Sequence, residues 1–188
     1  MNNNSARLTN LQPPDEYSAN VLMVVETPRG NRAKFKYDAA LEIFHLHKLL
    51  PLGTAFPFHF GFVPATRGED GDFIDILLLL DEPLPQGCIV EARVVGAIEA
   101  MQYAPDQPPQ RNDRIIAVAA ASEENNAWQS LDDLDSVLIA NIEQFFVNYN
   151  LAEGKKFNPI GRADAKSAKA LIQSAADAFA ATQDVAHI

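Results

Sequence analysis

The chain has 188 residues, 47% of them hydrophobic, which suits one domain with a sizeable core and argues against a disordered chain. Its 25 acidic residues outnumber the 15 basic ones and give a formal net charge of −10 at pH 7. Such a charge repels nucleic acid and anionic membranes, whereas a small phosphorylated ligand stays open because bound metal ions reverse the charge locally. No apolar run of the sequence approaches the roughly 18 residues that a membrane-spanning helix needs.

The start of the chain and its single cysteine bear on the cellular compartment. Residues 1–10 are polar and lack the basic start and apolar stretch of a secretory signal. Cys88 is the only cysteine, which excludes an intrachain disulfide and is consistent with a reducing environment. We therefore expect a cytoplasmic protein that forms a single domain over residues 1–188, with residues 1–15 and 183–188 loosely ordered.

Short strands are predicted along the first two-thirds of the chain. Residues 33–38 and 41–49 would pair as a hairpin, and the run at residues 73–80, apolar except for Asp75, indicates a strand buried on both faces. Residues 103–112 contain three prolines and are predicted to be a long loop without regular pairing. Several strands separated by turn signals are typical of a barrel. The predicted strands are residues 20–27, 33–38, 41–49, 73–80, 88–99 and 114–119.

Two amphipathic helices are predicted in the last third of the chain. Residues 130–148 carry apolar side chains every three to four positions, and Ser130 with Asp133 resembles a capping box at the start of this helix. Residues 164–181 show the same periodicity. The glycine and proline in residues 154–159 are expected to end the helical pattern between the two helices.

The segment from Gly68 to Asp75 is the most informative part of the sequence. It places Asp70, Asp72 and Asp75 directly before or at the start of an apolar run, and carboxylates this close repel each other unless a cation lies between them. Mg²⁺ prefers oxygen ligands, and Gly71 lets the backbone turn so that the side chains converge. A solvated acidic turn is the alternative, since Asp-Gly-Asp is frequent in turns and the spacing is not that of an EF-hand loop.

Basic residues on the predicted strands complement this acidic segment. Lys34 and Lys48 lie on the hairpin, Arg29 lies in the turn before it, and Arg114 begins the strand after the proline-rich loop. Each of them alone would be read as facing solvent. Together with the carboxylates they match the needs of an enzyme that acts on a polyphosphate, since cations balance the substrate charge while carboxylates hold metal.

Several motifs that follow one another along the chain carry a family resemblance. The most specific are FPFHFGFVP at residues 56–64 and EDGDFIDILL at residues 69–78. Supporting motifs are VETP at 25–28, KFKYD at 34–38, GAI at 96–98, NDRIIAV at 112–118 and FFVNY at 145–149. Over about residues 20–175 the sequence thus resembles the soluble family I inorganic pyrophosphatases. The resemblance implies an α+β fold, namely an OB-like five-stranded β-barrel with C-terminal helices packed against it.

The same resemblance implies a function and a set of site residues. The reaction would be hydrolysis of inorganic pyrophosphate to two phosphates by in-line attack of a metal-bound water, with Asp72 as the general base. Several Mg²⁺ ions, or Mn²⁺ in their place, would be held by Asp70 and Asp75, and Asp113 (or Asn112) would complete the metal site. A homo-oligomer, by resemblance a hexamer, is expected, with no nucleic acid or membrane as partner. The residues implied in substrate binding are Glu26, Lys34, Lys48, Arg114 and Tyr149.

The chain departs from the family pattern around the expected site. Lys36 stands where a glutamate is usual, Phe60 where a tyrosine is expected, and Asn150 where a phosphate-binding lysine is expected. Gln102 and Asn112 fall at two positions where aspartates are expected. Loss of those carboxylates would weaken the looser metal sites first.

Two alternatives to a pyrophosphatase remain open at this stage. The first is a hydrolase of the same fold that acts on another phosphoanhydride, or a weakly active or inactive relative that only binds phosphate. The second is a nucleic-acid-binding module of OB type, suggested by the alternating aromatic residues 56–62. The net charge of −10 opposes it, and alternation in a half-buried strand is the simpler reason for these aromatic residues.

Overall fold

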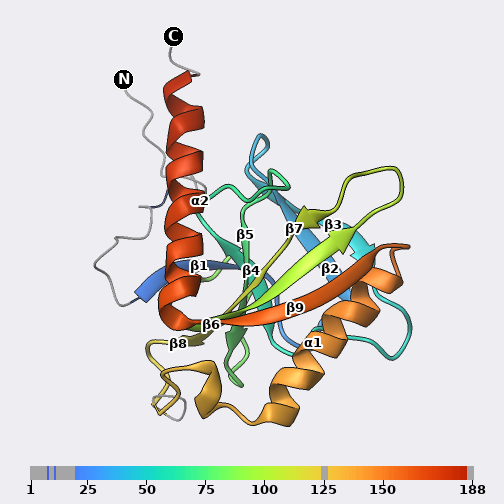
Figure 1. Cartoon of the computed structure of the whole chain (residues 1–188), viewed down its shortest axis with the longest axis vertical. Helices are drawn as coiled ribbons and strands as arrows, with labels where there is room; N and C mark the ends of the chain where they lie inside the picture. The colour runs from blue at the N-terminus through green and yellow to red at the C-terminus, as the bar shows by residue number, and fades with distance from the viewer. Residues whose placement is uncertain (1–7, 9–10, 12–19, 124–126, 186–188) are drawn as a thin grey trace.

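The computed structural model describes residues 8, 11, 20–123 and 127–185, and five of its strands close into a ring. Neighbours in the ring are antiparallel except β5 and β8, which are parallel, and a pairing between β1 and β6 completes it (Figure 1). In ring order these strands are β1 (Asn20–Thr27), β4 (His59–Val63), β5 (Ile74–Leu79), β8 (Arg114–Ala119) and β6 (Ile89–Tyr103). The predicted OB-like arrangement of five strands with C-terminal helices is thereby confirmed. The loose ends predicted at residues 1–15 and 183–188 concern mainly positions outside the described residues.

A separate hairpin of β2 (Ala33–Asp38) and β3 (Ile43–Leu49) extends from the ring, as predicted. Its register shifts between Lys34 and Phe35, so the strict alternation expected for β2 is broken. Lys34 and Tyr37 are both buried as a result, whereas Lys36 is half-buried. The first strand of the hairpin follows β1 in the chain, and it therefore directs polar side chains toward the ring near the end of β1.

The long strand β6 organises the sheet, because it pairs with β1, β7, β8 and β9. It runs four residues beyond the predicted end, to Tyr103, and β7 (Gln110–Arg111) pairs with its last part. The predicted loop at residues 103–112 is therefore too long at both ends, since the prolines lie inside the turn and leave its flanks free to pair.

Strand β9 (Lys156–Asp164) lies between the two helices, where the sequence predicts only an interruption. It pairs with β6 along its whole length and forms the edge of the sheet. Pro159 pairs opposite Ala100, next to a register shift at Glu99 and Ala100. An edge strand with an irregular register tolerates proline, which is why the proline did not prevent a strand here.

The two helices on either side of β9 in the chain, α1 (Ser136–Leu151) and α2 (Ala165–Val185), both pack against the sheet. The first helix begins six residues later than predicted. Ser130 and Asp133 instead bond within the short 3₁₀ helix η2 (Leu131–Asp133), while Asp135 caps α1 by accepting from the backbone N of Val137 at 2.7 Å. Among the described residues, the model contains no helix that is both long and apolar enough to span a membrane.

Aromatic side chains fill the core between the ring and α1. Phe56 and Phe60 are buried and contact each other and the aromatic side chains of α1. A Cβ atom at Gly61 would lie 1.9 Å from the carbonyl oxygen of Val24, so β4 approaches β1 too closely for a side chain there. Phe56, Phe60 and Phe62 of the aromatic run are thus buried, and the half-buried Phe58 packs against the same core.

Candidate active site

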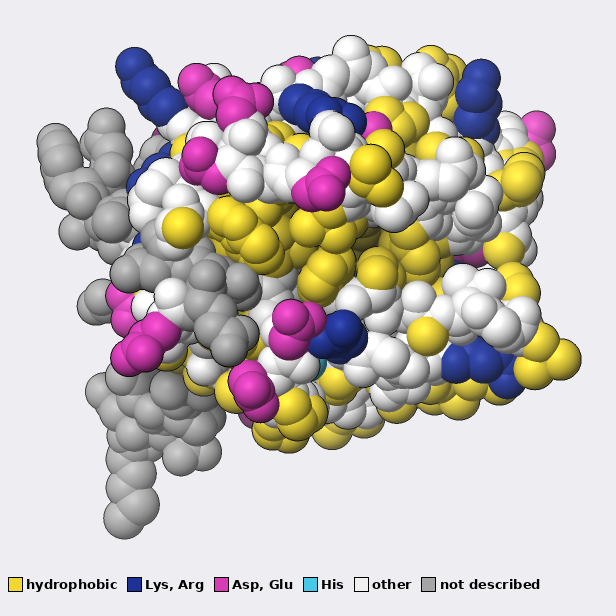
Figure 2. Space-filling model, turned by 90° about the horizontal axis from the view of Figure 1, so that it is seen from below, with side chains coloured by type: hydrophobic (Ala, Val, Ile, Leu, Met, Phe, Trp, Pro, Cys, Tyr) yellow, Lys and Arg dark blue, Asp and Glu magenta, His cyan; other side chains and the backbone are white. Residues whose placement is uncertain are grey.

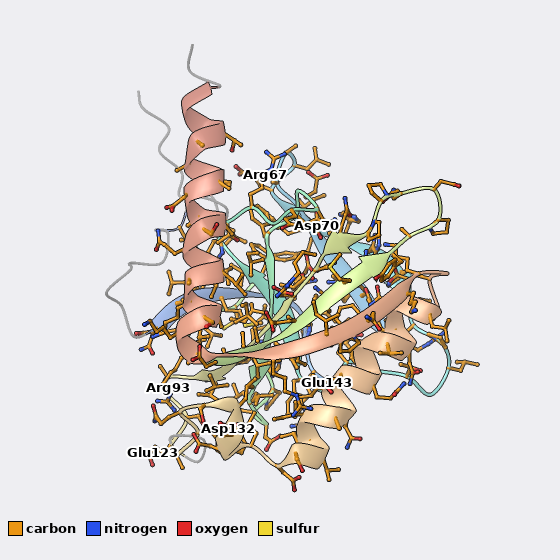
Figure 3. All side chains as sticks on the ribbon, in the orientation of Figure 1. Arg67, Asp70, Arg93, Glu123, Asp132 and Glu143 are labelled. Carbon is orange, nitrogen blue, oxygen red and sulfur yellow. The ribbon has the colours of Figure 1, made fainter. Side chains whose placement is uncertain are left out.

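A polar cavity of about 380 Å³ lies between the hairpin, the loop before β5 and the C-terminal part of α1. Figure 3 places Asp70 toward the upper end of the molecule, whereas Arg93, Glu123 and Asp132 lie at the lower end. Figure 2 views the molecule from that lower end, where hydrophobic side chains gather in a hollow. The polar residues that line the upper cavity include Glu26, Lys34, Lys36, His47, Asp70, Asp72, Asp75, Gln102, Asn112, Arg114, Tyr149, Asn150, Glu153 and Lys155.

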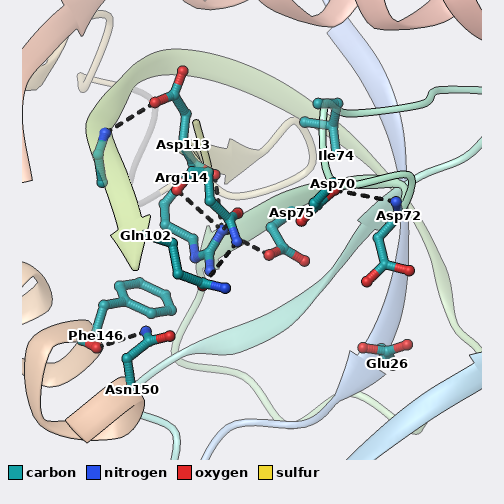
Figure 4. Close-up of polar contacts among 12 residues, drawn as sticks. Glu26, Asp70, Asp72, Ile74, Asp75, Gln102, Asp113, Arg114, Phe146 and Asn150 are labelled. Carbon is teal, nitrogen blue, oxygen red and sulfur yellow. Dashed lines mark hydrogen bonds and ion pairs between the residues drawn. The ribbon is translucent and has the colours of Figure 1, made fainter. Parts of the chain in front are cut away.

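The acidic loop turns so that Asp70, Asp72 and Asp75 all reach this cavity (Figure 4). Gly71 has a φ of 86°, a left-handed conformation that favours glycine. The turn is closed by the backbone N of Gly68, which donates to the carbonyl oxygen of Asp72 at 2.8 Å, while the Asp70 carboxylate accepts from the backbone N of Asp72 at 3.1 Å. The glycine therefore does what the sequence predicts, because it lets the side chains on either side converge.

Glu26 and Lys34 form a buried ion pair on one wall of the cavity. Both side chains are only 9% exposed. The Glu26 carboxylate also accepts from the backbone N of Tyr37 at 2.8 Å, and the Lys34 Nζ lies 4.2 Å from the centroid of the Phe60 ring. These contacts fix the position of the Lys34 charge.

Asp72 is bonded on both oxygens by the ammonium of Lys36, at 2.9 and 3.0 Å. The two side chains are 59% and 43% exposed, so water reaches this pair. Burial of its stem is the largest influence on the pKa of Lys36 and lowers it. The hydrogen bond and the charge of Asp72 outweigh this effect, so the pKa of Lys36 lies above its ordinary value.

Arg114 is bonded to Asp75 at 2.7 Å and is almost fully buried, with 4% of its side chain exposed. Its guanidinium lies 5.1 and 5.3 Å from the ring centroids of Phe146 and Phe157, and the Asn112 side-chain oxygen accepts from it. Burial raises the pKa of Asp75 above its usual range, although the charges of Arg114 and Lys34 oppose the shift. Asp75 is therefore the most firmly held carboxylate of the acidic segment.

The wall opposite the acidic loop carries amides. Gln102 and Asn112 both line the cavity, and the Asn112 amide donates to the Gln102 oxygen at 3.0 Å. Asp113 points away from it and accepts from the backbone N of Ala100 at 2.9 Å and from Arg111 at 2.5 Å (Figure 4). Residues 112 and 113 form the short connection between β7 and β8, and there the structure brings Asn112 to the cavity and gives Asp113 bonds elsewhere.

The C-terminal end of α1 closes the cavity. Tyr149 lines it, and burial raises the pKa of its hydroxyl, helped by the charge of Asp75. The Lys48 ammonium lies 3.8 Å from the centroid of the Tyr149 ring and pairs with Glu153, and Lys48 is not among the residues that line the cavity. The Asn150 side chain donates to the carbonyl oxygen of Phe146 at 2.9 Å.

Polar lining residues that the sequence analysis did not name as site residues include His47, Glu153 and Lys155. Lys155 directly follows the turn that ends α1, and that position after Gly154 is the signal that could have indicated it. By contrast, Arg29 bonds to Asp81 at 2.5 Å and is not among the residues that line the cavity.

The oxygen atoms of the cavity suit a hard divalent cation such as Mg²⁺. Asp70, Asp72 and Asp75 supply carboxylates, and Asn112 supplies an amide oxygen. Among the described residues, however, there is no group of three or more His, Cys, Asp or Glu side chains placed so that they could hold a metal ion together. Lys36 and Arg114 lie on two of the carboxylates instead, so the donor chemistry fits the metal while the acids are already partly neutralised.

A closed ring of five strands and a cavity that combines carboxylates with basic side chains define an enzyme of OB-like fold that handles a small polyanion. The model of the family described as "Inorganic pyrophosphatase" matches residues 23–180. The chain belongs to the inorganic pyrophosphatase family. The family predicted from the sequence motifs is thereby confirmed.

Relatives and solved structures agree with this assignment. The chain is similar to the inorganic pyrophosphatase of Haloferax volcanii, at 32% identity over 88% of this chain and 89% of the relative. For the inorganic pyrophosphatase of Neisseria meningitidis the identity is 34%, over 87% of this chain and 90% of the relative. The crystal structure of the Thermus thermophilus inorganic pyrophosphatase matches with a TM-score of 0.83 at 30% identity, and covers 93% of this chain and 99% of that one.

Proposed function

We propose that this protein hydrolyses inorganic pyrophosphate to two phosphates and that Asp72 acts as the general base. The observation that carries the proposal is the single cavity in which Asp70, Asp72 and Asp75 face Lys34 and Arg114, in a chain of the inorganic pyrophosphatase family. Hydrolysis of a phosphoanhydride needs charge neutralisation and positioning more than covalent help from the protein. A cavity with carboxylates on one side and fixed cations on the other meets both needs.

Basic side chains would bind the substrate. Lys34 and Arg114 are buried and held by their own partners, so they offer fixed charges to phosphate oxygens. Lys48 would act from behind Tyr149, and Lys155 adds a charge at the lining. Because burial raises the pKa of the Tyr149 hydroxyl, it stays protonated at neutral pH and can donate a hydrogen bond to a phosphate oxygen. Glu26 would orient Lys34 at the rim.

The carboxylates would serve the attacking water. Asp70 and Asp75, with Asn112 as an oxygen ligand, would hold Mg²⁺, or Mn²⁺ in its place, which supplies charge neutralisation and activation of water when bound. Asp72 lies between these two in sequence and its side chain is 59% exposed, so its carboxylate can approach a water molecule and accept its proton. Asp113 is left outside the ligand set because its carboxylate bonds to Ala100 and Arg111.

Phosphate release from pyrophosphate tests the proposal. We expect release by the wild-type protein with Mg²⁺ or Mn²⁺, and a loss of at least about a hundredfold for Asp72→Asn, as for other general bases. The matched control is Asp132→Asn, because Asp132 is an exposed aspartate at the lower end of the molecule (Figure 3). No release by the wild type with either metal would refute the proposed function, whereas undiminished release by Asp72→Asn would refute only the role of Asp72.

A second candidate is favoured by the amides Gln102, Asn112 and Asn150 on the cavity lining. They replace charge with hydrogen-bonding groups, which would suit a hydrolase for another phosphoanhydride or a protein that only binds phosphate. Rates for pyrophosphate, tripolyphosphate and a nucleoside triphosphate, measured side by side, distinguish these cases. The fastest rate should belong to pyrophosphate under the first proposal.

We further propose that the protein is a single domain that works in the cytoplasm as a homo-oligomer, a hexamer by likeness to its family, without nucleic acid or membrane partners. Hydrophobic side chains exposed along and after β3 support an association between copies, since they would gain from burial. They are Ile43, Leu46, Leu49 and Leu52. Light scattering coupled to size-exclusion chromatography gives the mass directly, and a monomer at micromolar concentration would contradict the oligomer.

A further inference from the structure

Lys36 is the cation that the structure places against the proposed base. Its ammonium bonds both oxygens of Asp72, at 2.9 and 3.0 Å, from the far side of the cavity, since it comes from β2 and Asp72 from the loop before β5. The charges of Glu26 and Asp75 also act on it. Lys36 therefore lies where the negative charges of the cavity add up.

The contacts of Lys36 differ from those of Lys34 and Arg114, two other cations of the cavity. Lys34 is buried against Glu26, and Arg114 is held by Asp75, Asn112 and two aromatic rings, so both are fixed parts of the wall. The Lys36 side chain is 43% exposed, and its described partner at the ammonium is Asp72. It can leave Asp72 without abandoning a buried charge.

Asp70 provides the contrast on the acidic side. Within the part of the chain that the structure describes, it has no basic partner and accepts only from the backbone N of Asp72. A divalent cation that enters the cavity therefore meets a free carboxylate at Asp70, a carboxylate shared with Arg114 at Asp75, and one covered by an ammonium at Asp72. The three acids are not equivalent toward a metal.

We propose that the Lys36 ammonium is a built-in cation of this cavity, which covers Asp72 in the substrate-free protein and takes the place of one divalent cation there. The proposal rests on the proposed function, because it assumes that Mg²⁺ or Mn²⁺ binds beside the acidic loop. It makes Lys36 a positioning residue that holds Asp72 and lowers the affinity of the cavity for metal. When substrate and metal arrive, the flexible lysine side chain can turn from Asp72 toward a phosphate oxygen.

The size of the effect follows from Coulomb's law. Even at the dielectric constant of water, a unit charge and a dication about 6 Å apart repel enough to weaken binding about tenfold. Removal of the Lys36 charge should therefore tighten metal binding to the substrate-free protein at least about tenfold. A carboxylate in its place should add a ligand as well as remove the repulsion.

Binding of Mn²⁺ to the full chain without substrate tests the proposal, with bound ions counted from the loss of the free Mn²⁺ signal in electron paramagnetic resonance. Lys36→Met should bind Mn²⁺ at least about tenfold more tightly than the wild type, and Lys36→Glu should bind one ion more. Lys166→Met and Lys166→Glu make the same charge changes on the exposed side of α2 and should leave binding as in the wild type. Thermal unfolding shows that each variant is folded.

A second measurement does not depend on Lys36 variants alone. If the ammonium covers Asp72, Asp72→Asn should weaken Mn²⁺ binding at least severalfold more in the Lys36→Met background, where the carboxylate is uncovered, than in the wild-type background. Equal Mn²⁺ affinity of the wild type and folded Lys36→Met would overturn the inference, and the proposed function would stand if the wild type still hydrolyses pyrophosphate. A wild type that neither binds Mn²⁺ nor hydrolyses pyrophosphate would remove both.

Discussion

The buried ion pair of Glu26 and Lys34 makes the sharpest prediction about stability. Lys34→Met keeps the length of the side chain but leaves the Glu26 carboxylate without its cation in a place where both side chains are only 9% exposed. The remaining described bond to that carboxylate is from the backbone N of Tyr37, at 2.8 Å. We therefore expect the variant to be clearly less stable than the wild type.

The magnitude follows from the burial. Loss of one partner of a buried ion pair costs about 3–5 kcal/mol, because the other charge stays uncompensated. Since the backbone N of Tyr37 still bonds Glu26, we place Lys34→Met at the lower end, about 3 kcal/mol in the free energy of unfolding. In a domain of this size that corresponds to a fall in Tm of about 6–12 °C.

Urea denaturation followed by circular dichroism gives the free energy of unfolding for each variant. The control is Lys36→Met, the same change two residues along the same strand, where the ion pair is exposed and the cost should stay below about 1 kcal/mol. Glu26→Gln in combination with Lys34→Met should recover at least half of the loss, because no unpaired charge remains. Equal costs for Lys34→Met and Lys36→Met would refute this account of the pair.

Three further predictions concern single contacts. Tyr149→Phe should lower kcat/KM for pyrophosphate about fivefold to tenfold, the value of one hydrogen bond to phosphate, and an unchanged kcat/KM would place the hydroxyl outside the reaction. Asn112→Ala should weaken Mg²⁺ binding measured by calorimetry, whereas Asp113→Ala should leave Mg²⁺ binding unchanged. Because Asp113 bonds to Ala100 and Arg111, Asp113→Ala should instead lower the free energy of unfolding by about 1–3 kcal/mol. The opposite pattern of Mg²⁺ binding would make Asp113 the ligand. Backbone hydrogen bonds hold the pKa of Asp133 below its usual 3.8, so its contribution to stability is present above that pH and lost as the pH falls through the lowered pKa. Asp133→Asn should remove this part of the pH dependence of urea unfolding, and an unchanged acid limb would contradict it.

Local patterns predicted most of the ring and the separate hairpin. Strand β1 and the hairpin partners β2 and β3 were visible because their apolar residues and turn residues lie close together in the sequence. Strand β9 was not visible, because Pro159 normally argues against a strand and only the irregular edge of β6 accommodates it. The start of α1 was misplaced for a similar reason, since Ser130 and Asp133 cap a turn that stops before the helix begins.

The candidate site, like the fold, was predictable only where its features depend on residues close together in the sequence. The acidic loop could be predicted, because Gly71 and its neighbouring carboxylates act over a few residues. Whether Asn112 or Asp113 faces the cavity could not, since that depends on the pairing of β6 with β7 and β8. The bond between Lys36 and Asp72 joins residues that are far apart in sequence, and no local pattern indicates it.

The pairing pattern of β6 has a consequence for how the protein folds. In the first half of β6, Arg93 pairs with Asn20 and Gly96 pairs with Asp164. The same strand therefore pairs with segments near both ends of the chain. Contacts between such distant segments slow folding toward the range of milliseconds to seconds. During synthesis on the ribosome, the nascent chain must extend beyond Asp164 before this strand has all its neighbours. Until then the cavity wall formed by Gln102 lacks its support, which makes the completion of the active site one of the last events in folding.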